Sequence, residues 1–279
     1  MDKKLVGIIG LGLMGGSLSL ALQKSSKDYK FIGYDHNIQH CEEALKLNLV
    51  NTIAKSIEDI KKCDIIILTI PVDGIIKVVQ ELTDISSTTT IIDFGSTKEK
   101  ICASIPSQIR ANFVAAHPMA GTEKFGPSAA IEDLYTNKVV VLCDIDQSGK
   151  KQRDVAIKLF NDISMQIVFM GAKEHDRHAA YISHMPHALS YSLANAVMNQ
   201  EQRESIIALA GGGFKDMSRI AKSSPNMWED IFRQNQTNLI EAIESFQKEL
   251  KKCKKMVENQ KWEELNQWMS QANKLHEIL

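Results

Sequence analysis

The chain has 279 residues, of which 44% are hydrophobic and 24% are charged, a length that suits one large domain or two ordinary ones. Its 33 Lys and Arg residues nearly balance its 34 Asp and Glu residues. Nucleic-acid binding requires clustered excess positive charge, so no nucleic-acid partner is expected. The five cysteines contain no Cys-x-x-Cys pair, which predicts reduced thiols in a cytoplasmic protein and neither a disulfide framework nor a zinc site.

Five of the 15 glycines fall within the first 16 residues, in an uncharged stretch that runs from Leu5 to Leu22. Two lysines precede this stretch, as in a signal peptide, but no small-residue cleavage site follows it. Glycine also weakens an apolar helix. We therefore expect neither a secretory segment nor a membrane partner.

A strand, a tight turn and a helix start account for these glycines better. Residues 4–9 form a short apolar run that is typical of a buried strand. Residues 10–15 then match the dinucleotide-binding pattern G-x-G-x-x-G, in which the glycines allow a sharp turn, a close pyrophosphate and close helix packing. The candidate cofactor-binding residues of this turn are Gly10, Gly12, Leu13, Met14 and Gly15. A coincidental glycine turn is the alternative.

Asp35 decides between the two nicotinamide cofactors. It ends an expected strand at residues 31–35, 20 residues after Gly15, where a ribose-binding carboxylate belongs. A carboxylate about 4 Å from a 2′-phosphate would be repelled by about 4 kcal/mol at an effective dielectric constant of 20. His36 and Asn37 follow it, so no Lys or Arg is at hand to receive that phosphate. The sequence therefore predicts NAD as the cofactor.

Strand-like and helical runs alternate through the first 170 residues, which predicts an α/β fold with a doubly wound, mostly parallel sheet of the Rossmann type. The expected strands after the first two are residues 64–70, 90–93, 112–116, 138–142 and 166–169. The expected helices are residues 37–47, 72–82, 97–104 and 150–161.

Helical patterns dominate from Lys173 onward, over residues 173–200, 225–257 and 260–278. We expect residues 1–170 to form an NAD-binding domain and residues 171–279 to form an all-α domain for dimerisation and substrate binding. About a hundred helical residues bury little core alone, so this second domain is expected to pack against another copy in a homodimer.

Two polar segments follow expected strands, where ligands bind in open α/β sheets. One is Asp93-Phe-Gly-Ser-Thr-Lys98, and the other is His117-Pro-Met-Ala-Gly-Thr-Glu123. A general base that takes the proton of an alcohol needs a pKa near the working pH, and histidine ordinarily titrates there, so His117 is a candidate for this role. A structural loop histidine is the competing interpretation.

The helical half carries a second polar patch, Ser183-His-Met-Pro-His187. Pro186 is expected to free the carbonyl of Ile182 and to bend the helix. Ser183 and His187 lie four residues apart, near one face. His175 and His178 raise the question of a metal site, but acid or Cys partners at ligand spacing are missing, so no metal is predicted.

Three glycines at 211–213 precede Lys215, Arg219 and Lys222, which share one face of a helix. This basic stripe predicts a fork for a substrate carboxylate, with Arg219 best suited to bidentate binding. A solvated basic face is the alternative.

Together these segments resemble the prephenate dehydrogenases of tyrosine biosynthesis over essentially the whole chain. The motifs that carry the resemblance are residues 10–17 (GLGLMGGS), 93–96 (DFGS), 117–123 (HPMAGTE), 183–187 (SHMPH) and 211–219 (GGGFKDMSR). The resemblance implies NAD-dependent oxidative decarboxylation of prephenate to 4-hydroxyphenylpyruvate, with release of CO2 and NADH. It also implies a homodimer through the helical domain and no metal.

The resemblance further implies roles for single residues. His117 matches the catalytic histidine that hydrogen-bonds the ring hydroxyl, and Ser96 matches a serine that orients this hydroxyl or the histidine. Arg219 matches the arginine that binds a substrate carboxylate. The residues that match positions lining or gating the pocket are His187, Ser183, Glu123, Thr122, Lys215, Asp216 and Trp228.

Alternatives to prephenate oxidation stay open. Arogenate, alone or beside prephenate, differs from prephenate only in an amino group, and no motif settles this choice. A non-catalytic NAD-binding protein would not need His117 and Arg219 together. A β-hydroxyacid dehydrogenase would require a catalytic lysine in the helical domain. No fused mutase or amino-acid-sensing domain is expected, so inhibition by tyrosine would act at the substrate pocket.

Overall fold

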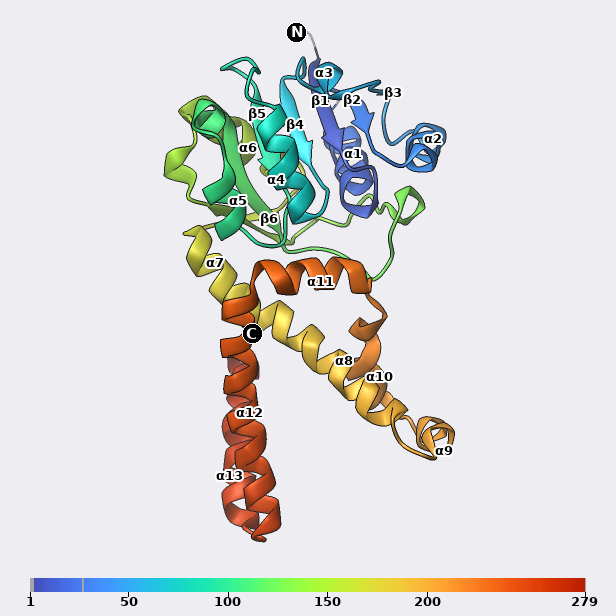
Figure 1. The fold of residues 1–279 in the computed structure, drawn as a ribbon, viewed down its shortest axis with the longest axis vertical. Coiled ribbons are helices and arrows are strands. Elements are labelled where there is room, and N and C mark those ends of the chain that lie inside the picture. The colour runs from blue at the N-terminus through green and yellow to red at the C-terminus, as the bar shows by residue number, and fades with distance from the viewer. Residues whose placement is uncertain (1–2, 27, 279) are drawn as a thin grey trace.

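The structure, a computed structural model, describes residues 3–26 and 28–278 (Figure 1). Its first half is built on an eight-stranded sheet with the order β3-β2-β1-β4-β5-β6-β7-β8. The strands are β1 (Lys4–Ile9), β2 (Tyr29–Tyr34), β3 (Thr52–Ile53), β4 (Ile65–Leu68), β5 (Thr90–Asp93), β6 (Phe113–Pro118), β7 (Val139–Cys143) and β8 (Gln166–Met170).

All neighbouring strands are parallel except β6 and β7, which pair antiparallel. The chain runs outward from β1 to β3 and then returns to place β4 on the other side of β1, so the strand order reverses between β1 and β4. In an open α/β sheet this switch point marks the ligand crevice at the carboxyl edge. The predicted doubly wound, mostly parallel sheet is confirmed.

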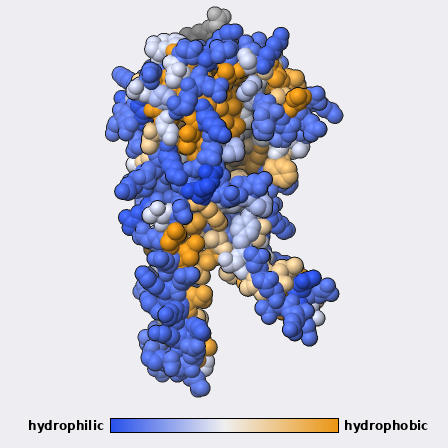
Figure 2. All heavy atoms as spheres, in the orientation of Figure 1, coloured by the Kyte–Doolittle hydropathy of each residue, from blue (hydrophilic) through white to orange (hydrophobic). Residues whose placement is uncertain are grey.

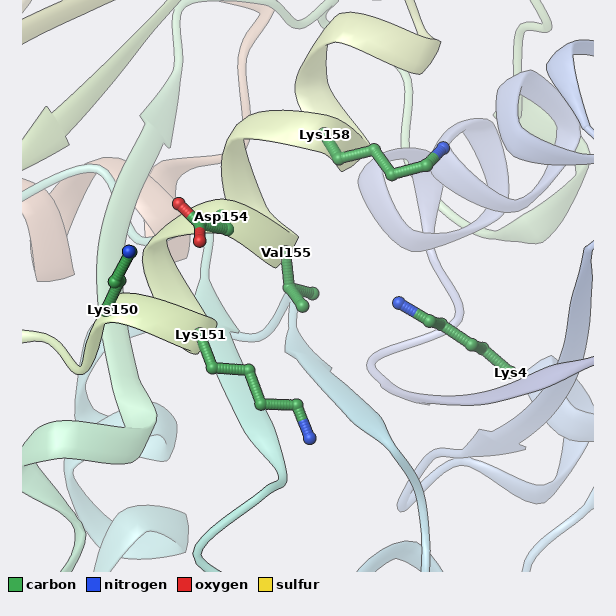
Figure 3. A pocket seen from close by; sticks show the side chains of 6 residues that line it. All are labelled: Lys4, Lys150, Lys151, Asp154, Val155 and Lys158. Atoms are coloured by element: carbon green, nitrogen blue, oxygen red, sulfur yellow. The ribbon is translucent and has the colours of Figure 1, made fainter.

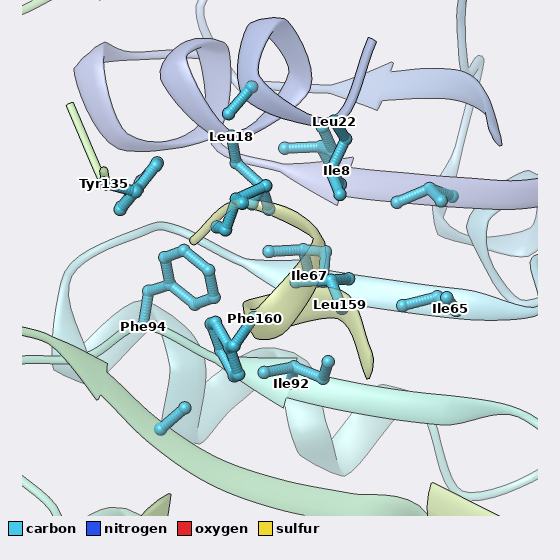
Figure 4. Close-up of a cluster of buried hydrophobic side chains, with 14 of the residues drawn as sticks. Ile8, Leu18, Leu22, Ile65, Ile67, Ile92, Phe94, Tyr135, Leu159 and Phe160 are labelled. Atoms are coloured by element: carbon cyan, nitrogen blue, oxygen red, sulfur yellow. The ribbon is translucent and has the colours of Figure 1, made fainter. Parts of the chain in front are cut away.

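Helices cover both faces of the sheet. They are α1 (Leu13–Ser25), α2 (Ile38–Lys46), α3 (Ile57–Ile60), α4 (Val72–Glu81), α5 (Glu99–Ser104) and α6 (Lys150–Asp162). Alternate strand residues enter different cores: Ile8 and Ile67 pack with Leu18 and Phe160 on one face (Figure 4), whereas Ile66 packs on the other. Burial on both faces explains why the strands are continuous apolar runs.

The second half is helical and forms two limbs below the sheet (Figure 1). Its helices are α7 (Ala172–Ala179), α8 (Met185–Met198), α9 (Arg203–Ala208), α10 (Gly212–Ser218), α11 (Pro225–Gln234), α12 (Gln236–Glu258) and α13 (Trp262–Asn273). Helix α11 lies across the carboxyl edge of the sheet. Asp230 on α11 accepts a hydrogen bond from the amide of Val72 at 3.1 Å, so the helical half caps α4 from below.

The structure differs from the predicted elements at two points of the helical half. The expected helix 173–200 is divided by a π-helical turn, Ala180–His184, just before Pro186, which has no N–H to continue a regular ladder. The expected helix 225–257 breaks at Asn235, whose side chain donates to the carbonyl of Asp176 at 2.6 Å. The short elements β3 and α3 were not predicted either.

The helical half buries few apolar side chains. Its exposed large hydrophobic residues include Leu209 on the turn after α9, Leu250 on α12 and Trp262 on α13, with 87%, 57% and 57% of their surfaces exposed. Figure 2 shows apolar surface along the limb that α12 and α13 form. This half therefore has little core of its own, as the sequence predicts. In the described ranges, no helix has the length and apolarity that a membrane crossing needs.

Candidate active site

The glycine turn after β1 has the geometry of a dinucleotide site. Gly10 has φ of 100°, and a Cβ there would lie 2.5 Å from the carbonyl oxygen of Thr69. A Cβ on Gly15 would lie 2.1 Å from the carbonyl oxygen of Gly10. A Cβ on Gly12 would instead point into open space, with its nearest atom 4.0 Å away. Gly10 and Gly15 are thus required by the fold, whereas the space at Gly12 is open for a ligand.

Other residues fix the turn and the first turn of α1. Oδ2 of Asp35 accepts the amide of Leu11 at 2.9 Å, and Oδ1 accepts the amide of Asn37 at the same distance. The carbonyl of Met14 accepts the hydroxyl proton of Tyr135 at 2.7 Å. Leu13 begins α1 beside Gly12, whose lack of a side chain leaves the first amides without a side-chain cap. These residues fit a dinucleotide, with the pyrophosphate at the helix start and Asp35 at the ribose.

Ser96 and His117 lie at the same edge of the sheet, because β5 and β6 are parallel neighbours. A fully buried ion pair of Asp93 and Lys98 bonds to the backbone just before each of them. Asp93 accepts the amides of Gly95 at 3.0 Å and Ala116 at 3.1 Å, and Lys98 donates to the carbonyl of Ala116 at 2.7 Å. The neighbours of Ser96 and His117 are therefore tied to one buried pair. Burial raises the pKa of Asp93, and Lys98 and the two amides oppose that rise.

His117 meets the helical half directly. Its Nδ1 lies 2.8 Å from Nε2 of His175 on α7, and Nδ1 of His175 lies 2.8 Å from Oδ1 of Asp176. Burial lowers the pKa of His117 well below its usual range, and the nearby His175, Lys98 and His184 lower it further. An uncharged imidazole has a lone pair that can accept a proton, which is the state that a general base needs.

A second group of aromatic rings lies between the π turn and α11. The ring of His187 stacks on Trp228 with centroids 3.5 Å apart and 23° between the planes. Nδ1 of His187 is 2.9 Å from the carbonyl of Ser183. Burial lowers the pKa of His187, and the positive charge of Arg219 lowers it further. Nε1 of Trp228 is buried and has no hydrogen-bond partner among the described residues.

The two groups are joined by Asn235. Its Nδ2 donates to the carbonyl of Asp176 and lies 3.1 Å from Nδ1 of His184, which is 1% exposed. The rings of His184 and Trp228 are 6.1 Å apart and meet at 75°. The contacts thus run without interruption from His117 to the aromatic group, across both halves of the chain.

The structure does not bring all predicted site residues into this arrangement. Thr122 and Glu123 lie exposed in the loop after β6, and Lys215 and Asp216 lie exposed on α10. Within the described part of the chain, no hydrogen bond or ion pair joins these four to the His117 group. The predicted basic stripe is also not on one helix, because α10 ends at Ser218 and residues 219–222 form a 3-10 turn.

Sequence reasoning missed several residues of the site. The pattern around His175 suggests at most a metal ligand, and no motif singles out Asp176 or Asn235. Lys98 stands out only as the last residue of a polar segment. Its polar and charged neighbours in the sequence do not indicate that it is buried or that it pairs with Asp93. Across the described residues, no group of three or more His, Cys, Asp or Glu side chains is placed to hold a metal ion.

A hollow on another part of the surface is lined by four lysines, one aspartate and one valine (Figure 3). Lys4 begins β1 there, at the amino edge of the sheet, and the remaining lining residues belong to α6. This hollow lies at the opposite end of β1 from the glycine turn, so it is not part of the candidate site.

Comparison with known families agrees with this architecture. The family described as prephenate dehydrogenase, nucleotide-binding domain, matches residues 18–169, and the prephenate dehydrogenase dimerization domain matches residues 171–271. The chain belongs to the prephenate dehydrogenase family. It is therefore an NAD-dependent oxidoreductase, as the glycine turn and Asp35 predict.

Relatives of the chain support this assignment. A prephenate dehydrogenase of Bacillus subtilis is 33% identical over 278 residues, which cover 97% of this chain and 74% of the relative. The crystal structure of prephenate dehydrogenase from Aquifex aeolicus, in complex with hydroxyphenyl propionate and NAD+, has a TM-score of 0.93 at 32% identity and covers 100% and 99% of the two chains. Synechocystis arogenate dehydrogenase has a TM-score of 0.82 at 27% identity, covering 98% and 99%.

Proposed function

We propose that the chain catalyses the NAD-dependent oxidative decarboxylation of prephenate to 4-hydroxyphenylpyruvate, CO2 and NADH. The observation that carries this proposal is the position of His117. It is an uncharged base at the carboxyl edge, on the third strand from the glycine turn, and it contacts the helical half. The two similar dehydrogenase structures agree with such a substrate.

The residues of the chain have separate tasks in this reaction. Nε2 of His117 accepts the proton of the ring hydroxyl, and Ser96 at the neighbouring strand end orients that hydroxyl or the imidazole. Arg219 binds a substrate carboxylate as a bidentate donor. NAD+, when bound at the glycine turn and Asp35, supplies the hydride acceptor. Loss of the ring carboxylate gives an aromatic product, so the substrate itself supplies the driving force.

The remaining pocket assignments belong to the same proposal. Ser183, His187 and Trp228 line the pocket, supported by the stacked rings and by the indole N–H, which has no partner among the described residues. Thr122, Glu123, Lys215 and Asp216 gate the pocket or contact substrate, including across a dimer. The cofactor-binding residues are Gly10, Gly12, Leu13, Met14, Gly15 and Asp35.

We infer that residues 1–170 are the NAD-binding domain and residues 171–279 the helical domain for dimerisation and substrate binding. The sheet ends at Met170 and α7 begins at Ala172, which supports this boundary. A homodimer is supported by the exposed apolar limbs and by the dimerization-domain match. A cytoplasmic location is supported by the five free cysteines.

The direct test follows NADH formation with prephenate and, separately, with arogenate, using NAD+ and NADP+ in turn. We expect the highest kcat/KM with prephenate and NAD+. A higher kcat/KM with arogenate would favour arogenate as the substrate. The similarity to Synechocystis arogenate dehydrogenase is the reason for testing it. No NADH or NADPH with either substrate would contradict the proposal.

His117→Asn tests the proposed base. Asn cannot take up the hydroxyl proton, so we expect kcat to fall by about 100-fold or more while NAD+ and prephenate still bind. Turnover is measured by NADH absorbance and binding by calorimetry. A kcat near that of the unmodified chain would remove His117 from the role of base.

A further inference from the structure

A line of hydrogen bonds leads from the start of α5 through α7 to the imidazole of His117. The amide of Lys98 donates to Oδ1 of Asp176 at 2.7 Å, and the amide of Glu99 donates to Oδ2 at 2.9 Å. Oδ1 lies 2.8 Å from Nδ1 of His175, whose Nε2 lies 2.8 Å from Nδ1 of His117. His175 and Asp176 are each 2% exposed, so water does not compete for these bonds.

The direction of each bond follows from the amides at its start. A backbone N–H only donates, so both oxygens of Asp176 are acceptors, and Nδ1 of His175 donates to one of them. In a neutral imidazole the lone pair of His175 is then on Nε2. His117 therefore donates from Nδ1, which leaves Nε2 of His117 as the nitrogen that accepts a proton.

We propose that His175 and Asp176 are positioning residues for His117, which hold its proton on Nδ1 and its lone pair on Nε2. The inference rests on the proposed function, in which Nε2 takes the proton of the substrate hydroxyl. In that step the substrate O–H bond breaks, an N–H bond forms at Nε2, and the Nδ1 proton stays in its bond to His175. The new positive charge on His117 then faces the carboxylate of Asp176 through the His175 ring.

The surrounding charges make Asp176 the relevant carboxylate. Lys98 and His184 oppose a positive charge on His117, as burial does. Asp93 is the other buried carboxylate nearby, but it is paired with Lys98 and bonded to backbone amides. Asp176 is hydrogen-bonded to the ring of His175, which in turn is hydrogen-bonded to His117. In catalytic triads a carboxylate likewise sets the tautomer of the catalytic histidine.

A purely structural role for the pair makes a different prediction. Asp176 also anchors the first amides of α5, so its loss would lower stability whether or not it acts on His117. A structural role alone leaves the tautomer of His117 unchanged and lowers activity only through the folded fraction. The tautomer and the kcat of folded enzyme therefore separate the two roles.

The first experiment measures the tautomer in the ligand-free chain. Imidazole nitrogen shifts by 15N NMR, assigned with His117→Asn and His175→Gln, report which nitrogen carries the proton. At neutral pH we expect both His117 and His175 to carry it on Nδ1. A proton on Nε2 of His117, or a doubly protonated His175, would overturn the proposal without any assay of turnover.

The second experiment compares two replacements of His175 in the whole chain. Gln offers an acceptor oxygen to Nδ1 of His117, whereas Leu offers none. We expect kcat to fall about 10-fold in His175→Gln and about 100-fold in His175→Leu, with each KM within about threefold of the unmodified value. His178→Gln changes an exposed histidine on the same helix and should leave kcat unchanged.

Equal kcat in both variants and in the unmodified chain would overturn the positioning role, as would equal losses in the Gln and Leu variants. Should His175→Leu fail to fold, the kcat of folded His175→Gln still decides, since a purely structural role would leave it at the value of the unmodified chain. An unmodified chain that oxidises neither prephenate nor arogenate would contradict the proposed function. The tautomer of His117 measured by NMR would still test the positioning by His175 and Asp176.

Discussion

At the scale of single residues, burial changes what a histidine can do in this protein. Burial lowers the pKa of His117, His184 and His187, yet only His117 stands at a strand end facing the crevice. His184 is enclosed by Asn235 and Trp228 and serves the junction between the π turn and α11. The same side chain is thus a candidate base at one position and a packing element at another.

Arg219→Ala tests the carboxylate fork. Hydrogen bonds to charged groups are worth about 1.5–3 kcal/mol, so we expect KM for prephenate to rise about 10- to 100-fold with a smaller change in kcat. Steady-state NADH assays measure both constants. Lys222→Ala is the matched control, because Lys222 is a cation of the same 3-10 turn and should have little effect. An unchanged KM in Arg219→Ala would remove this residue from substrate binding.

His184 should make the stability of the fold depend on pH. Burial lowers its pKa to about 4, whereas the unfolded chain titrates near 6.5. Because the unfolded state takes up the proton first, the contribution of His184 is complete above pH 6.5 and declines as the pH falls toward 4. The total loss is about 3 kcal/mol. Urea unfolding at pH 7, 5.5 and 4.5 measures this decline.

His184→Gln is the control for this pH dependence. The variant should show a smaller decline between pH 7 and 4.5, and the remaining part comes from His117 and His187, which shift in the same direction. An identical decline in the variant and the unmodified chain would show that His184 does not titrate as its burial implies.

At the scale of elements, periodicity predicted most of the first half, because strands buried on two faces leave unbroken apolar runs. The polar segments that follow two of these runs also predicted that Ser96 and His117 lie at one edge of the sheet. Helix breaks were harder to predict, since the break at Asn235 depends on a carbonyl 59 residues earlier in the chain. The partner of His117 was missed for the same reason, as His175 is 58 residues away in sequence.

The glycine turn offers a matched pair of substitutions. Gly12 has φ of −77° and open space around its Cβ position, so Gly12→Ala should fold normally and lower NAD+ affinity about 10-fold or more. Gly15→Ala would place a Cβ against the carbonyl of Gly10, so it should destabilise the fold by about 1–3 kcal/mol. Calorimetric NAD+ titration and urea unfolding measure the two effects. Unchanged NAD+ affinity in Gly12→Ala would place the pyrophosphate elsewhere.

At the scale of the whole molecule, the sheet half has two buried cores and the helical half has little core. This imbalance was predictable, because about a hundred helical residues bury little core alone. The direction in which the apolar faces of the helical limbs point was not predictable. An amphipathic pattern does not show whether the apolar face of a helix packs against the same chain or against another one.

We expect the chain to sediment as a dimer of twice its 31.2 kDa mass at micromolar concentration. Leu250→Glu places a charge on the exposed apolar surface of α12 and should shift the equilibrium toward monomer. Ile38→Glu is the control, because Ile38 is 73% exposed at the start of α2 in the sheet half. A chain that sediments as a monomer would contradict the dimer.

The π turn at Ala180–His184 also sets the rotational phase of α8. An α-helix advances about 100° per residue, so a turn wider by one residue rotates everything after it relative to a continuous helix. Removing one residue there would leave α7 and its bond to His117 in place but would turn His187 away from Trp228. The angular relation between His117 and the His187–Trp228 stack therefore depends on the length of this one turn.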